Sequence, residues 1–350
     1  MSDETYIRRA IQIAHHGLGS ARPNPSVGAV IVCNNMIIGE GFTSAYGGPH
    51  AEVNAINSVK DRSLLKDSTI YVTLEPCSHY GKTPPCSDLI INNGIKNVVI
   101  GCIDDNEAVA GKGIKKLRDA HCNVKVGVLE SECKQLHKRF FSFHNKKRPY
   151  IILKWAQSND GFLSPETKET QKPVWISNAY SKTLVHKWRA EEQAILVGTN
   201  TVNTDNPSLT TRHYKGYNPT RIILDRNLTL NQDLNVFNTE ASTIVITSKD
   251  VINKNGIATN VILEPINWSQ KDSIAKQISS VLFKHNINSV IIEGGAQTLQ
   301  TFINENLWDE ARIFTGTIEF KNGITGPKIK GELISSHHIK DDRLAIFKNS

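Results

Sequence analysis

The chain has 350 residues, 39% of them hydrophobic and 21% charged, which predicts two domains that each bury a full core. No apolar run approaches the roughly 20 residues that cross a bilayer, so the composition excludes a membrane-spanning protein. The net charge of +7 and the pI near 9.0 favour anionic partners, either nucleic acid or phosphorylated small molecules.

The first residues predict an amphipathic helix and not a signal peptide. Ile7, Ile11 and Ala14 share one helix face, and acidic residues precede them. Without a secretory segment, the six cysteines indicate a reducing compartment, where cysteines bind metal or act in catalysis more often than they form disulfides. We therefore expect a cytoplasmic protein.

Short apolar runs then alternate with helical patterns, which predicts a layered α/β domain ending near residue 145. Strands are expected at residues 27–32, 36–42, 69–76, 97–104 and 123–129. Helices are expected at residues 51–59, 86–93, 111–120 and 130–144. The basic run at 137–148 is expected to be a solvated linker.

A second α/β series follows, and its apolar runs are typical of buried parallel strands. Strands are expected at residues 150–158, 194–198, 221–225, 243–248, 261–265 and 289–295. Helices are expected at residues 178–192 and 270–285, and another after the glycine pair in IIEGGAQTLQ. That pair would let backbone amides approach a phosphate, although its spacing differs from the dinucleotide fingerprint.

One set of residues in the first domain predicts a catalytic zinc. His50 stands two residues before Glu52 at a helix start, and Cys77 and Cys86 flank a polar loop. Zinc deaminases hold the metal with one His or Cys and two Cys, and a nearby glutamate moves protons. The pattern predicts one zinc ion on His50, Cys77 and Cys86, with Glu52 as the catalytic residue. Zinc hydroxide would then replace an amine on a ring carbon.

Three other interpretations stay open. His79 could complete a closed, structural site, in which case the protein would be a zinc-braced binding protein and Glu52 would have no task. The cysteines could also be unrelated to metal. A polynucleotide deaminase would suit the basic pI, but it needs aromatic surface, and only 7% of residues are aromatic. The remaining cysteines are expected in the core, namely Cys33, Cys102, Cys122 and Cys133.

The segments ARPNPSVGAV, GGPHAEVNAI, TLEPCSHYGKTPPC and GCIDDNEAVAGKG resemble the deaminase half of the bifunctional riboflavin-biosynthesis proteins. The resemblance implies a three-layer, cytidine-deaminase-like domain over residues 1–145 that acts on a diaminopyrimidinone ribosyl 5′-phosphate. It also implies substrate contacts from Asn24, Lys82 and Thr83. The sequence DDNEA at 104–108 departs from the proline-bearing turn of the family.

The segments LKWAQSNDG, VWIS, HKWRAEEQAILVGTNTVNTDNPSLTTR and EGGAQT resemble the reductase half of the same family, a relative of dihydrofolate reductase. This implies an α/β, NADPH-dependent reductase over residues 146–350. Cofactor contacts are expected from Gln157, Trp175, Thr201, Asp205, Arg226, Gly294, Gly295, Ala296, Gln297 and Thr298. Substrate contacts are expected from Lys154, Arg189, Leu209, Arg212 and Glu293.

The resemblance therefore implies deamination followed by reduction of the ribosyl group to ribityl. The acid in the reduction stays open among Lys154, Asp205, Glu293 and water. Arg226, with Lys249, is expected near the 2′-phosphate of NADPH because it follows a strand. The family pattern changes at Pro173 and Gln193. We expect a small phosphorylated pyrimidine as partner, no nucleic acid or membrane, and a homo-oligomer, specifically a dimer.

Overall fold

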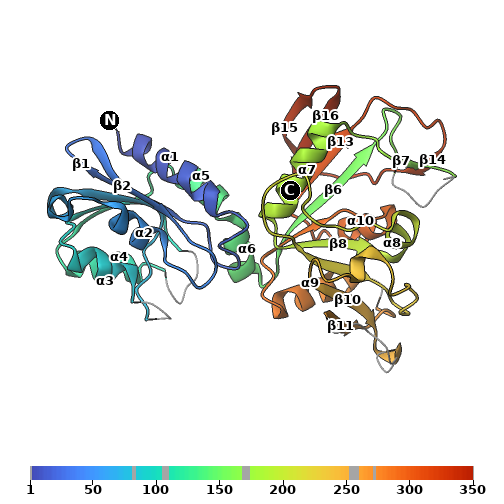
Figure 1. Ribbon diagram of the computed structural model, residues 1–350, viewed down its shortest axis with the longest axis horizontal. Helices are drawn as coiled ribbons and strands as arrows, with labels where there is room; N and C mark the ends of the chain where they lie inside the picture. The colour runs from blue at the N-terminus through green and yellow to red at the C-terminus, as the bar shows by residue number, and fades with distance from the viewer. Residues whose placement is uncertain are drawn as a thin grey trace. The chain divides into compact units, whose positions relative to one another are not determined.

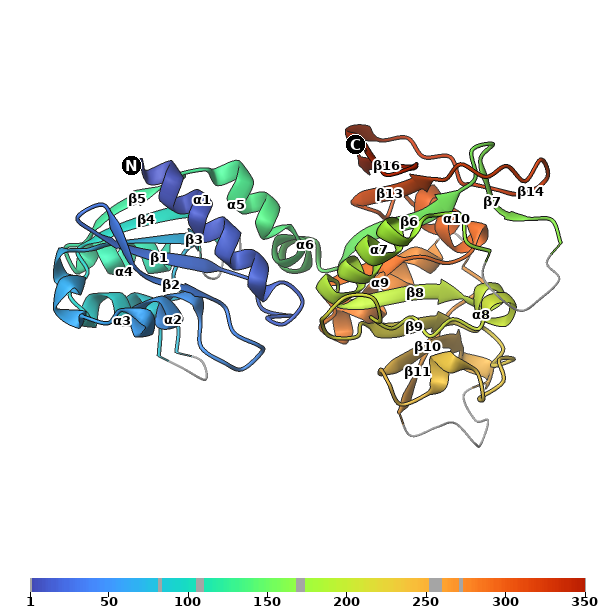
Figure 2. The same ribbon diagram turned by 45° about the horizontal axis from the view of Figure 1, so that its top comes forward.

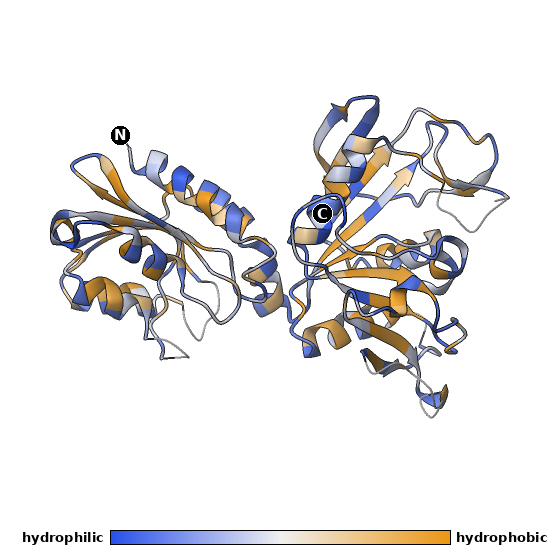
Figure 3. Cartoon of the chain, in the orientation of Figure 1, coloured by the Kyte–Doolittle hydropathy of each residue, from blue (hydrophilic) through white to orange (hydrophobic). Residues whose placement is uncertain are grey.

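The computed structural model describes residues 2–80, 84–104, 110–167, 174–251, 260–270 and 273–349. The chain divides into two compact units, Met1–Lys147 and Arg148–Ser350. Hydrophobic residues concentrate on the strands of each unit (Figure 3), as expected for sheets that carry the cores. Within the described residues, no helix combines the length and the hydrophobicity needed to cross a bilayer.

The first unit is a three-layer α/β structure. Its described residues form a five-stranded sheet in the order β2-β1-β3-β4-β5, in which β1 is antiparallel to both neighbours and β3, β4 and β5 are parallel. Helices α1 and α5 cover one face, and α2, α3 and α4 cover the other (Figures 1 and 2). The strands are β1 Gly28–Cys33, β2 Met36–Phe42, β3 Thr69–Leu74, β4 Asn97–Cys102 and β5 Asn123–Val126. The helices are α1 Asp3–Ala14, α2 Ala51–Ser58, α3 Cys86–Asn92, α4 Lys112–Asp119, α5 Glu130–Leu136 and α6 Lys138–Lys146.

Most local expectations for this unit are confirmed, and one helix is not. Asn34 and Asn35 have φ of 49° and 61°, the left-handed values that a two-residue hairpin turn needs. The single helix expected at 130–144 is two helices, because the backbone leaves helical geometry at His137, whose buried ring contacts Thr73 on β3. The solvated-linker prediction for 137–148 was also wrong over α6, which buries Phe141 and Phe143.

The second unit contains a larger, mixed sheet. Over its described residues, nine strands run in the order β11-β10-β9-β8-β12-β6-β13-β16-β15, parallel from β11 to β13. Strand β16 is antiparallel to β13 and to β15, a C-terminal addition that the sequence analysis did not anticipate. The strands of this sheet are β6 Tyr150–Gln157, β8 Ala194–Gly198, β9 Thr220–Leu224, β10 Thr243–Ser248, β11 Val261–Ile266, β12 Ser289–Ile292, β13 Glu310–Thr315, β15 Glu332–Ile339 and β16 Asp342–Lys348. A separate pair comprises β7 Phe162–Pro165 and β14 Gly323–Thr325.

Helices cover both faces of this sheet. Leu282 of α9 and Phe302 of α10 join the core on one face, while Val185 of α7 and Val202 of α8 pack on the other. The helices are α7 Ala179–Glu191, α8 Thr199–Asp205, α9 Ile274–Lys284 and α10 Ala296–Asn304. Because β6, β8, β9 and β12 are parallel, their carboxyl ends meet at one edge, where α8 and α10 begin. Ligands of open α/β sheets bind at this kind of edge.

Candidate functional site

The first unit brings three metal-type donors together. One side-chain donor atom from each of His50, Cys77 and Cys86 lies within 4.8 Å of the other two. The Nδ1 atom of His50 is 3.7 Å from the sulfur of Cys77 and 3.3 Å from that of Cys86. A tetrahedral zinc with ordinary bond lengths separates nitrogen and sulfur ligands by about 3.6 Å. The donor set and its spacing therefore fit zinc.

The geometry argues against a closed site that includes His79. That side chain is exposed, and it is not part of the donor cluster. A site with three protein ligands keeps a coordination position for water, which is the arrangement of catalytic zinc. The four other cysteines are buried in the core, as expected.

Two helix starts converge on the donors. His50 is the N-cap of α2 and Cys86 is the first residue of α3. The backbone N–H of Cys86 donates to the sulfur of Cys77 over 3.3 Å. The hydrogen bond between the two thiols lowers the pKa of Cys77 to about 4 and raises that of Cys86. A thiolate, the form that binds metal, is thus favoured at Cys77.

Glu52 lies in the first turn of α2, buried beside the donors. Its burial and the nearby charge of Cys77 raise the pKa of this carboxyl to about 7. A carboxyl group with a pKa near neutrality can both accept and return a proton, which general acid–base catalysis requires.

Of the three residues expected to contact the substrate here, the structure describes only Asn24. Asn24 lies between α1 and β1, where its backbone N–H donates to the carbonyl of Ala21. Lys82 and Thr83 lie outside the described residues, as does most of the departing DDNEA stretch.

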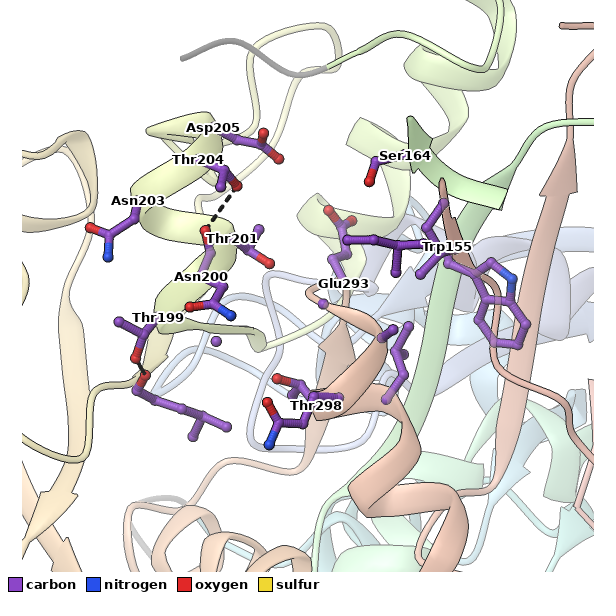
Figure 4. Close-up of a pocket in the computed structure, with 18 of the residues that line it drawn as sticks. Trp155, Ser164, Thr199, Asn200, Thr201, Asn203, Thr204, Asp205, Glu293 and Thr298 are labelled. Atoms are coloured by element: carbon purple, nitrogen blue, oxygen red, sulfur yellow. Dashed lines mark hydrogen bonds between the residues drawn. The ribbon is translucent and has the colours of Figure 1, made fainter. Parts of the chain in front are cut away.

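The second unit contains a cavity of about 1150 Å³ at the carboxyl edge of its sheet. Its volume exceeds that of most small-molecule pockets, which suits a dinucleotide together with a substrate. Figure 4 shows Thr201 and Asp205 of α8 on one side, Trp155 on the other, and Glu293 between them. The expected residues that line it are Lys154, Trp175, Thr201, Asp205, Arg226, Glu293, Gly295, Ala296, Gln297 and Thr298.

The two glycines of the pair, Gly294 and Gly295, have different environments. Gly295 is the N-cap of α10 with a φ of 63°, a left-handed value that favours glycine, and it lines the cavity. Gly294 instead packs on β8, where an added Cβ would stand 2.7 Å from that of Val197. The starts of α8 and α10 both face the cavity, so backbone N–H groups and helix dipoles are available to a phosphate.

A buried charge cluster occupies the inner wall. Arg189 of α7 binds Glu293 with an Nη2–Oε2 distance of 2.6 Å, and both side chains are largely buried. Burial opposes ionisation of Glu293, but the charges of Arg189 and Lys154 outweigh it and lower the pKa of this carboxyl to about 2. Burial lowers the pKa of Lys154, which Glu293 partly offsets. The carboxylate is therefore fixed in its ionised form.

Leu209 and Arg212 lie on a loop that does not line the cavity but joins this cluster. Arg189 donates to the carbonyl of Thr210, and the Nη1 of Arg212 donates to the hydroxyl of the same threonine. The backbone N–H of Arg212 donates to Nδ1 of His186 over 3.0 Å. Sequence reasoning missed His186. Its spacing of three residues from Arg189 on one helix was the available signal.

The loop is further held by a residue that sequence analysis did not single out. Arg221 on β9 is fully buried, and its Nε donates to the carbonyl of Ser208 over 3.0 Å. Leu209 has a φ of 56°, which is unusual for a side chain of its size. Backbone strain at this residue persists because the surrounding contacts fix the loop.

Two remaining expectations concern residues beside the cavity. Gln157 ends β6, does not line the cavity, and accepts the indole N–H of Trp155 over 2.9 Å. Gln193 binds the 286–288 turn through its side chain, accepting from Asn288 and donating to Asn286, so the departure from the family pattern serves a structural contact. Pro173 lies outside the described residues.

Comparison with known proteins finds matches to both halves. Residues 1–102 match a family model described as the cytidine and deoxycytidylate deaminase zinc-binding region, and residues 149–319 match the RibD C-terminal domain. The riboflavin biosynthesis protein RibD of Aquifex aeolicus is 40% identical over 340 residues, covering 95% of this chain and 89% of that protein.

Solved structures of similar fold match this chain along nearly its whole length. A diaminohydroxyphosphoribosylaminopyrimidine deaminase/5-amino-6-(5-phosphoribosylamino)uracil reductase from Thermotoga maritima superposes with a TM-score of 0.90 at 36% identity, covering 99% of both chains. RibD of Acinetobacter baumannii superposes with a TM-score of 0.89 at 30% identity, also covering 99% of both. The expected fold class, a deaminase-type domain followed by a reductase-type domain, is confirmed.

Proposed function

The chain belongs to the RibD family of bifunctional deaminase-reductases of riboflavin biosynthesis, and on that premise we propose that residues 1–145 perform the deamination and residues 146–350 the reduction. The substrate is a diaminopyrimidinone ribosyl 5′-phosphate. Its ring loses one amine as ammonia, and its ribosyl group is then reduced to ribityl. The observation that carries the proposal is the three-donor cluster with the buried Glu52 beside it.

In the first unit, His50, Cys77 and Cys86 would hold the zinc ion. When bound, zinc lowers the pKa of a coordinated water from about 15.7 to about 7, which makes hydroxide available at neutral pH. Glu52 accepts the proton of the attacking water and returns protons to the ring nitrogen and to the departing ammonia. Asn24, Lys82 and Thr83 would contact the substrate.

The experiment that tests this assignment uses Glu52→Gln, which keeps the side-chain shape and removes the titrating group. The variant should retain zinc and lose ammonia release by about 10²- to 10⁴-fold, the usual contribution of a general acid–base group. Supplied with the already deaminated substrate, it should oxidise NADPH at the wild-type rate. Normal ammonia release would remove Glu52 from the mechanism.

In the second unit, the cavity would hold NADPH and the sugar of the substrate. NADPH supplies a hydride for the sugar carbon. Thr201, Asp205 and the start of α10 face the cavity and would contact the cofactor phosphates and ribose, with Trp175 as a further contact and Gln157 and Gly294 supporting the site from outside. Arg226 also lines the cavity, which supports its expected contact with the 2′-phosphate, whereas Lys249 does not line it.

The charge cluster would hold the substrate. Arg189 and Arg212 offer guanidinium groups suited to a phosphate, and Leu209 supports the loop between them. Lys154 and Glu293 reach the cavity beside them. Of these two charged groups, Glu293, with a pKa near 2, has no proton to give at neutral pH, whereas burial lowers the pKa of Lys154 and so favours release of its proton.

We also propose a cytoplasmic homodimer that binds neither nucleic acid nor membrane. Strand β15 lies at the edge of the large sheet, and it exposes Leu333 by 54% and Ile334 by 55%. Exposed apolar edge strands are pairing surfaces, and the commonest soluble assemblies are symmetric dimers. Sedimentation of wild type and Ile334→Asp tests this. A wild-type monomer, or a dimer that the substitution leaves intact, would contradict it.

A further inference from the structure

Glu75 is a buried acid that the mechanism above does not use. It follows β3 directly and stands two residues before Cys77. Its carboxylate accepts three backbone N–H groups at the start of α4, from Gly111 at 3.0 Å, Gly113 at 2.8 Å and Ile114 at 3.2 Å. Hydrogen bonds to a buried carboxylate are roughly twice as strong as neutral ones, so this contact fixes the end of β3 to α4.

A second contact, made by the Cα of Gly113, joins α4 to the same stretch of chain. A Cβ added to Gly113 would stand 2.0 Å from the carbonyl oxygen of Pro76. The φ of Gly113 lies outside the left-handed region, so an alanine there would be strained by close contacts, chiefly this one, and not by its backbone conformation. Only glycine at this position lets the first turn of α4 pack on the residue that precedes Cys77.

The next turn of α4 contacts the other side of the metal-binding loop. Lys116 binds Asp88 over 2.5 Å, and Asp88 belongs to the first turn of α3, which starts with Cys86. The Nζ of Lys116 also lies 5.9 Å from the ring centre of Tyr80, within the same loop. Helix α4 thus touches the chain beside both cysteine ligands.

We propose that Glu75 is a positioning residue for the metal centre. Through the first turn of α4, Glu75 holds Cys77 and Cys86 at the spacing that binds zinc. The inference rests on the proposed function, because it takes the cluster to be a zinc site. A metal gains affinity when its ligands are ordered before it binds, and groups that orient ligands typically contribute 10- to 100-fold in metal affinity. Glu75 contacts neither zinc nor substrate in this role.

The test measures zinc release from the full-length, zinc-loaded protein to an excess of chelator. Glu75→Gln replaces one acceptor oxygen with an amide nitrogen that cannot accept, and Gly113→Ala displaces α4 from Pro76 while keeping the Glu75 carboxylate, from which the new Cβ would stand 3.2 Å. Both should release zinc about 10 to 100 times faster than wild type. The cobalt-substituted variants should also show altered visible absorption, which reports the thiolate geometry directly.

Two further variants keep the result interpretable. Lys115→Ala breaks an exposed ion pair with Asp119 on the outer side of α4, so it should leave release and spectrum unchanged. Lys116→Met removes the partly exposed link to Asp88 and should accelerate release less than Glu75→Gln does, which covers the case in which the buried variants fail to fold.

The outcomes separate this inference from the function on which it rests. If wild type binds zinc and the folded Glu75→Gln and Gly113→Ala variants lose only thermal stability, with release and cobalt spectrum unchanged, Glu75 is a helix cap and the inference is wrong. If Lys115→Ala accelerates release as much as they do, the effect is not specific to the contact. If wild type binds no zinc, the proposed function itself fails, and the inference fails with it.

Discussion

Replacing Arg189 by methionine should destabilise the second unit because it leaves Glu293 buried without its main partner. Methionine keeps most of the length of the side chain and removes its charge. The two groups are 2.6 Å apart, and their side chains are only 12% and 8% exposed. Removing one member of such a pair lowers the stability strongly, because the remaining charge stays buried with little access to water that could solvate it.

The pKa of Glu293 sets the size of the effect. The carboxyl falls from its ordinary value of 4.5 to about 2 despite burial, which corresponds to about 3 kcal/mol at about 1.4 kcal/mol for each pKa unit. Because the pKa is lowered, this stabilisation is fully present above about pH 4.5 and is lost as the pH falls through about 2. Arg189 is the largest of the charges that lower this pKa, so Arg189→Met should cost about 3 kcal/mol at pH 7, the usual cost of breaking a buried ion pair.

The assay is urea unfolding followed by tryptophan fluorescence. All five tryptophans lie between Trp155 and Trp308, so this signal reports the second unit alone. Glu293→Gln and the double variant complete a mutant cycle. The loss of stability in the double variant should be about 2 kcal/mol smaller than the sum of the two single losses, because neither member of the pair is left without the other. Reductase activity should fall in all three variants, while ammonia release should not change.

Additive losses in that cycle would refute the reasoning. They would mean that the short distance between Arg189 and Glu293 carries no interaction energy, so the pair could not fix the charge of the carboxylate. A loss of ammonia release in a folded Arg189→Met protein would equally contradict the assignment of this residue to the reductase.

Three other predictions concern Arg226, His186 and His137. Arg226→Ala should weaken NADPH binding by about 10- to 100-fold, the worth of a charge-assisted hydrogen bond, and leave NADH binding nearly unchanged; equal effects in titrations of both nucleotides would contradict the 2′-phosphate contact. His186→Leu leaves the backbone N–H of Arg212 without an acceptor and should raise the KM of the reductase about tenfold. His186→Asn keeps an acceptor and should restore the wild-type KM. If it does not, the hydrogen bond from Arg212 to His186 does not support substrate binding. Burial lowers the pKa of His137 to about 3, so the folded protein binds fewer protons and the first unit should lose about 2 kcal/mol between pH 7.5 and about pH 5. Hydrogen exchange of β3 amides measures this loss, which His137→Gln should abolish.

The local structure of this protein could largely be predicted from its sequence. Short apolar runs predicted β1, β3, β6, β8 and β12, because a strand that is buried on both faces is apolar along its length. The prediction failed at His137, where a contact with Thr73 from a distant strand interrupts a pattern that reads as one helix. It also missed β13 to β16, whose exposed β15 lacks the alternation that identifies a strand.

The metal donors were predicted from sequence because the chemistry itself restricts them. A catalytic zinc needs a particular set of sulfur and nitrogen ligands with an acid nearby, and few residue types at few spacings supply it. His50, Glu52, Cys77 and Cys86 therefore stand out without any knowledge of the fold. The residue proposed to support them does not stand out in the sequence. Glu75 accepts hydrogen bonds from N–H groups at the start of α4, which follow it by 36 to 39 positions.

The sequence by itself predicted two α/β units, the candidate donor set for zinc and the resemblance to the family, since each depends only on which residue types stand at which positions along the chain. Only the tertiary structure decided that Arg189 meets Glu293 across 104 positions, that His186 holds the backbone of Arg212, and that Gly294 packs on β8 while Gly295 faces the cavity. These meetings depend on the strand order β8-β12-β6, in which neighbours in space are far apart in the chain. Local periodicity encodes which face of a strand is buried, but it carries no information about which strand lies beside it.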